Sequence, residues 1–107
     1  MYPIDGEANI TKDPDHLTFE IGDEVTLKCT IRNVNKTIKK DLKYQWFREG
    51  SDGAELMLEE TGKVVKLSPL SLSNKGKYKC VITCDKLRGW KIKSKLVVNA
   101  KCELSVL

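Results

Sequence analysis

Residues 76–84 read Gly76-Lys77-Tyr78-Lys79-Cys80-Val81-Ile82-Thr83-Cys84. Successive side chains of a β-strand point to opposite faces, so every second residue from Tyr78 to Cys84 shares one face. That face is aromatic or apolar, whereas the opposite face begins with Lys77 and Lys79. The run therefore predicts a strand over 77–84 that turns its tyrosine–cysteine face into a core and its lysines outward.

Two further runs complete a spaced pattern. Residues 24–29 alternate in the same way and end at Cys29, and residues 44–47 read Tyr44-Gln45-Trp46-Phe47. Together with Tyr78 and Cys80 this four-point pattern resembles the immunoglobulin superfamily, over residues from about 20 to about 98. The run Trp46-Phe47-Arg48-Glu49-Gly50 is similar to the corresponding run of the intermediate and constant-2 sets.

This resemblance implies an all-β fold, a two-sheet Greek-key sandwich over residues 1–100, with residues 101–107 as a tail or a linker to a following domain. It also implies a disulfide between Cys29 and Cys80, with Trp46 packed on it and Tyr78 at the corner before the second cysteine. Such a bond would stabilise the fold by about 4 kcal/mol in the chain-entropy model. Two departures from the family stand out: the gap from Cys29 to Trp46 is long, and Asn74 replaces a common aspartate.

Alternation and turn residues predict the other elements. We expect an edge strand near 8–11, a strand ending near 31, a long loop over 32–41, and strands over 42–48, 64–70 and 90–98, with a short strand over 55–59. If residues 85–89 form the hairpin loop, Lys79 lies directly opposite Lys95.

Size and charge limit the class of protein. The chain has 107 residues and a formal net charge of +4. That length suits one domain, and the charge is too small and too mixed to indicate nucleic-acid binding. No run approaches the ~18 apolar residues of a membrane span, so we expect no membrane insertion by this segment. The first twenty residues lack the apolar core of a secretory signal, so the chain is either cytosolic or a piece of a longer multidomain protein.

Catalytic and metal chemistry are not expected. The one histidine, His16, lies in a polar turn far in sequence from every cysteine. Cys80 and Cys84 are four residues apart on a strand, about 13 Å, which is too far for two thiolates on one zinc ion. We therefore expect neither an enzyme nor a cofactor, and Cys84 is interpreted as a small buried hydrophobe.

Two sequences match the acceptor motif for N-glycosylation: Asn9-Ile10-Thr11 and Asn35-Lys36-Thr37. Together with the implied disulfide they favour an extracellular or cell-surface protein. The alternative is a cytoplasmic immunoglobulin domain that serves as a scaffold or spacer, with Cys29 and Cys80 reduced and both asparagines unmodified.

A lysine-rich sheet face is the first candidate for binding. Alternation turns the following residues outward on three neighbouring strands: Lys43, Phe47, Lys77, Lys79, Val81, Lys91, Lys93 and Lys95. Like charges opposite each other destabilise a sheet, so this face suits an acidic protein partner or a heparin-like sulfated glycan. Phe47 and Val81 would add apolar contacts. The alternative is a solvated face that discourages aggregation.

The turn between the last two strands is the second candidate. Leu87, Arg88 and Trp90 are residue types that are common in binding hot spots or their surroundings, and loops often carry recognition. A glycan on Asn35 would crowd this tip. The resemblance implies non-catalytic protein recognition, as in receptors and adhesion molecules, and the sheet face ranks above the tip.

Overall fold

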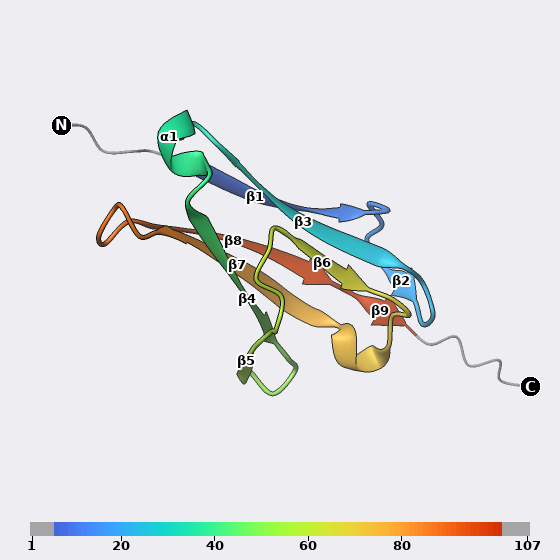
Figure 1. The fold of residues 1–107 in the computed structure, drawn as a ribbon. Helices are drawn as coiled ribbons and strands as arrows, with labels where there is room; N and C mark the ends of the chain where they lie inside the picture. The colour runs from blue at the N-terminus through green and yellow to red at the C-terminus, as the bar shows by residue number, and fades with distance from the viewer. Residues whose placement is uncertain (1–5, 102–107) are drawn as a thin grey trace, which may run out of the picture.

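The computed structural model describes residues 6–101, which form a two-layer β-sandwich (Figure 1). Its elements in chain order are β1 (Glu7–Asp13), β2 (Phe19–Glu20), β3 (Val25–Arg32), α1 (Lys36–Lys39), β4 (Leu42–Glu49), β5 (Glu55–Met57), β6 (Val64–Leu67), a 3-10 turn η1 (Leu72–Asn74), β7 (Gly76–Cys84), β8 (Lys91–Val98) and β9 (Ala100–Lys101).

One layer is a sheet of three strands in the order β1-β3-β6, and the other has four in the order β5-β4-β7-β8. β2 and β9 form a small parallel pair at one end, where Phe19 lies opposite Ala100. The chain passes from β3 in the first sheet to β4 in the second, back to β6 and again to β7. The predicted all-β sandwich is confirmed.

Alternating apolar residues of both sheets form the core. Inward-facing side chains of β3, β6 and β7 are buried, and so is Trp46 at the centre of β4. The fully buried residues with large side chains are Trp46, Tyr78, Phe19, Leu27, Leu70 and Ile82. The indole N–H of Trp46 donates to the carbonyl oxygen of Gly62 at 2.7 Å, so its one polar atom is satisfied inside the core.

Tyr78 fixes the turn that leads into β7. Its hydroxyl donates to the backbone carbonyl of Asn74, four residues earlier. Asn74 in turn accepts hydrogen bonds through its side-chain oxygen from the backbone N–H and the hydroxyl of Ser71, at 2.8 and 3.0 Å. Asn74, which stands where the family commonly has aspartate, therefore stabilises η1 through its hydrogen bonds to Ser71.

Three local predictions need correction. The predicted loop over 32–41 contains α1, because Asn35 caps a helical turn with its side chain. The strand predicted over 64–70 ends at Leu67, since Pro69 has no N–H to donate to a ladder. The strand predicted over 55–59 ends at Met57. The last described strand, β9, ends at Lys101, and residues 102–107, including Cys102, lie outside the described residues.

Candidate functional site

The register of the four-stranded sheet places the predicted face residues side by side. β7 lies between β4 and β8. Lys79 lies opposite Phe47 on one side and Lys95 on the other, and Val81 lies opposite Gln45 and Lys93. The hairpin register derived from the sequence is therefore confirmed. We call this surface the outer face.

Lys79 does not present a free charge. Its ammonium lies 2.8 Å from a carboxylate oxygen of Glu55 on β5 and 4.8 Å from the centroid of the Phe47 ring. Its side chain is only 19 % exposed. The expected repulsion between Lys79 and Lys95 is thus offset inside the molecule, and Phe47 is half-buried beneath the lysine.

Two other lysines of the outer face also have acidic neighbours. The ammonium of Lys43 lies 2.7 Å from Asp85, and that of Lys77 lies 3.8 Å from Glu49. Asp85 raises the pKa of Lys43, first through their hydrogen bond and then through its charge. These pairs are largely exposed to solvent and contribute little to stability.

The lysines of β8 differ from the rest. Lys91, Lys93 and Lys95 are exposed, and within the part of the chain that the structure describes none of them forms an ion pair. Val97 continues the same side of the strand and is 47 % exposed. We call Lys91, Lys93 and Lys95 the β8 lysine row. It follows β8, the last strand of the four-stranded sheet, and β1 of the other sheet contacts this strand, where Ile10 donates its backbone N–H to the hydroxyl of Ser94.

Val81 must be removed from the expected contact surface. It points outward but is only 7 % exposed, because it lies on a central strand between longer side chains of β4 and β8. The stems of lysines cover apolar surface while their charged ends stay in water. Alternation gives the direction of a side chain but not how deeply its neighbours cover it.

The second candidate, the tip between β7 and β8, is less accessible than predicted. Leu87 and Trp90 are half-buried, and Trp90 packs against the core beside Ile92. Only Arg88 of the three proposed residues is exposed. The ion pair of Lys86 with Asp41, at 3.0 Å, ties this tip to the segment after α1.

Cys29 and Cys80 meet in the core between the sheets, and both are free thiols in this structure. The thiols hydrogen-bond to each other, and this contact together with burial raises the pKa of Cys80. The contact between the two buried thiols is what the implied disulfide between Cys29 and Cys80 requires. Cys84 is also buried, as expected for a small hydrophobe.

The glycosylation candidates are both on the surface. Asn9 is exposed on β1. Asn35 is exposed at the start of α1, where its side-chain oxygen accepts from the backbone N–H and the hydroxyl of Thr37 at 2.9 and 3.0 Å. Both bonds use the oxygen and neither uses the amide nitrogen, which is the atom that carries an N-linked glycan.

Comparison with known proteins settles the family. The sequence model of a family described as immunoglobulin domain matches residues 9–83. This chain belongs to the immunoglobulin domain family. No curated protein sequence matches the chain.

Among residues 6–101 no group of three His, Cys, Asp or Glu side chains could hold a metal ion. Within that range no helix has the length and apolar character to cross a membrane.

Solved structures share the fold of this immunoglobulin domain. The second Ig-C2 domain of human Fc-receptor like A has a TM-score of 0.64 at 16 % identity, covering 94 % of this chain and 99 % of that one. A structure of the N-terminal four Ig domains of Dscam1 isoform 4.44 has a TM-score of 0.61 at 17 % identity, covering 88 % of this chain. The match spans only 21 % of that Dscam1 chain.

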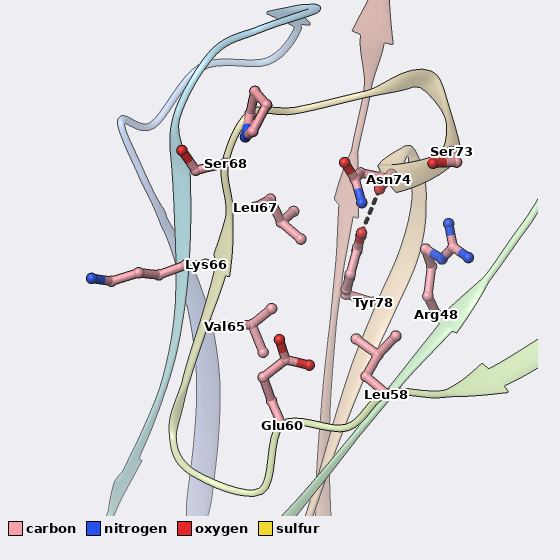
Figure 2. A pocket seen from close by; sticks show the side chains of 11 residues that line it. Arg48, Leu58, Glu60, Val65, Lys66, Leu67, Ser68, Ser73, Asn74 and Tyr78 are labelled. Atoms are coloured by element: carbon pink, nitrogen blue, oxygen red, sulfur yellow. Dashed lines mark hydrogen bonds between the residues drawn. The ribbon is translucent and has the colours of Figure 1, made fainter.

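The immunoglobulin domain also contains a polar cavity that sequence reasoning missed (Figure 2). It has a volume of about 290 Å³ and lies between β6 and the strands β4 and β7, which bear Arg48 and Tyr78. In the sequence, Arg48 stands out only within the run Trp46-Phe47-Arg48-Glu49-Gly50, which is similar to a family motif. Its half-burial is not visible in the sequence, because the cavity joins residues from four separate segments.

Proposed function

We propose that this domain is a non-catalytic protein-recognition module of a cell-surface or secreted protein, and that it binds an acidic partner surface through the β8 lysine row. One observation carries the proposal. Lys91, Lys93 and Lys95 are exposed and form no ion pair within residues 6–101, whereas Lys43, Lys77 and Lys79 on the same face are paired.

The chemistry of the row suits a rim of carboxylates. Alternate residues of a strand are about 7 Å apart, so the three ammonium groups can reach acidic side chains spread along a facing strand or helix. Such charges steer association and choose partners more than they add affinity. Exposed Val97 at the end of the row supplies an apolar contact that lysines lack.

The proposed location rests on the core cysteines and the exposed acceptor sites. We propose that Cys29 and Cys80 form a disulfide in the oxidising compartments, and that Asn35 and Asn9 carry glycans, as part of a longer chain. Asn35 precedes α1, on the segment between β3 and β4, and is not part of β8. The alternative remains a cytoplasmic scaffold domain in which both thiols stay reduced.

A heparin-like sulfated glycan is the second candidate ligand, because a straight row of lysines also matches a linear polyanion. The test uses the biotinylated domain, assembled on streptavidin, as a probe for dissociated cells of the source organism. Protein recognition predicts binding that survives heparinase and is lost after mild surface proteolysis. Loss of binding after heparinase alone would show that the ligand is the sulfated glycan and not a protein.

A further inference from the structure

The outer edge of β6 is open. β6 pairs with β3, and the N–H of Cys29 donates to the carbonyl of Lys63 at 2.8 Å. In an antiparallel ladder the hydrogen-bonded positions alternate, so the backbone groups of Val65 and Leu67 face β3. Those of Val64 and Lys66 therefore point away from the sheet, and no backbone hydrogen bond within residues 6–101 takes them.

The cavity of about 290 Å³ lies directly along this edge (Figure 2). Its wall on the β6 side includes the side chains of Val65 and Leu67, and its opposite wall is formed by Arg48, Tyr78 and Asn74. A second cavity of about 380 Å³ shares Arg48 and Ser73 with the first and is lined by Leu56 and Leu72, each 54 % exposed. An open strand edge and a hollow behind it thus form one continuous feature.

Arg48 is the unsatisfied charge of this feature. It is half-buried, and within the described range its guanidinium forms neither an ion pair nor a hydrogen bond. A partly desolvated guanidinium is costly unless it is paired, and its planar donors fit a carboxylate. Arg48 and Lys75 line the two cavities together with Glu60 and Asp52, and the side chain of Lys66 points away from them. The unpaired guanidinium of Arg48 is therefore the group that favours an anionic ligand.

We infer that the β6 edge and the Arg48 cavity bind an extended acidic peptide segment of a partner protein. The peptide lies beside β6 as an added strand, and its backbone hydrogen-bonds with Val64 and Lys66. One aspartate or glutamate side chain enters the cavity and pairs with Arg48. The open backbone groups point to a peptide rather than a small anion, because an inorganic anion uses the guanidinium but not a strand edge.

The site is separate from the β8 lysine row, so the experiment removes that row first. Random heptapeptides displayed on phage are selected on the domain with Lys91, Lys93 and Lys95 changed to Gln. We expect enrichment of sequences with one acidic residue between β-branched residues. The selected peptide should perturb the backbone amide signals of Val64 and Lys66 in NMR spectra and bind at least tenfold more tightly than its copy with Gln in place of the acid.

Three variants assign the contacts. Arg48→Gln should remove the preference for the acidic peptide over its Gln copy, whereas Arg88→Gln, an exposed arginine at the tip, should not. Lys66→Pro removes an edge N–H without touching the ladder to β3 and should weaken binding at least tenfold, whereas Lys66→Ala should not. Should Lys66→Pro fail to fold, the selected peptide N-methylated at alternate residues tests the same contact.

Three results would overturn the inference. The first is a selection without enrichment, and the second is an acidic preference that Arg48→Gln leaves unchanged. The third is equal binding of the N-methylated and unmodified peptides. Binding of inorganic phosphate or sulfate at Arg48, with no peptide response at Val64 and Lys66, would assign the cavity to a small anion instead.

Discussion

Lys79 and Lys95 lie directly opposite each other on β7 and β8, but only Lys79 has a carboxylate neighbour among residues 6–101, at 2.8 Å from Glu55. The strand β5 therefore compensates the inner lysine and leaves the lysine of the edge strand to solvent. This asymmetry locates the free positive charge of the outer face on β8.

The Lys79–Glu55 pair should contribute measurably to stability because Lys79 is largely covered by Phe47 and its neighbours. A double-mutant cycle with Lys79→Gln and Glu55→Gln is expected to give a coupling energy of about 0.5–1 kcal/mol in urea unfolding. Lys43→Gln with Asp85→Asn is the matched control, since both side chains are more than half exposed. A coupling energy as large in the control pair would contradict the special position of Lys79.

Tyr78→Phe should destabilise the domain by about 1–2 kcal/mol, because it removes the hydrogen bond to the partly buried Asn74 carbonyl without changing the ring. The free energy of unfolding in urea measures the effect. Tyr44→Phe is the control, since Tyr44 is half-buried on β4 and should change stability less. Equal losses of unfolding free energy in the two variants would show that the Tyr78–Asn74 hydrogen bond contributes no more to stability than the hydroxyl of Tyr44.

Because of Tyr78, we also expect the free energy of unfolding to depend on pH in the alkaline range. Burial raises its pKa from 10.0 to about 12. The folded state therefore holds the phenolic proton more tightly than the unfolded state. The stability from this residue is complete below about pH 10 and declines as the pH rises toward 12. The free energy of unfolding of the wild type should fall by about 2 kcal/mol more than that of Tyr78→Phe between pH 9 and 12; parallel curves would contradict it.

The disulfide proposed for Cys29 and Cys80 has a direct chemical test. Intact mass after thiol alkylation, with and without prior reduction, is measured on protein from its natural source. Two cysteines that react only after reduction, with added glycan mass, support the extracellular domain. The same protein should lose about 4 kcal/mol of stability on reduction. Thiols that all react without reduction in unfolded protein, and no glycan, would favour the cytoplasmic scaffold.

The fold could be predicted because its signals are local and repeated. Alternation in residues 24–29 and 77–84 gave the strands and their inward faces, and the length of the 85–89 loop gave the register of Lys79 against Lys95. The cap by Asn35 could have been read from its position before Lys36–Lys39, but a single helical turn leaves almost no periodic signal.

The site was only partly predictable because its properties depend on neighbours that are distant in sequence. Glu55 reaches Lys79 only because β5 pairs beside β4, and Val81 is covered only because both flanking strands carry long side chains. The Arg48 cavity depends on the early end of β6. None of these contacts follows from a periodic pattern in one segment.

The measurement that bears most directly on recognition through β8 compares two variants of equal charge in the cell-binding assay. One has Lys91, Lys93 and Lys95 changed to Gln, and the other has the exposed Lys28, Lys36 and Lys39 changed to Gln. We predict that the β8 variant loses at least tenfold in binding while the control variant stays within about twofold of the wild type. Thermal unfolding curves verify that both variants are folded. Equal loss in both variants would show that net charge alone attracts the cells, and unchanged binding of the β8 variant would contradict the proposed surface.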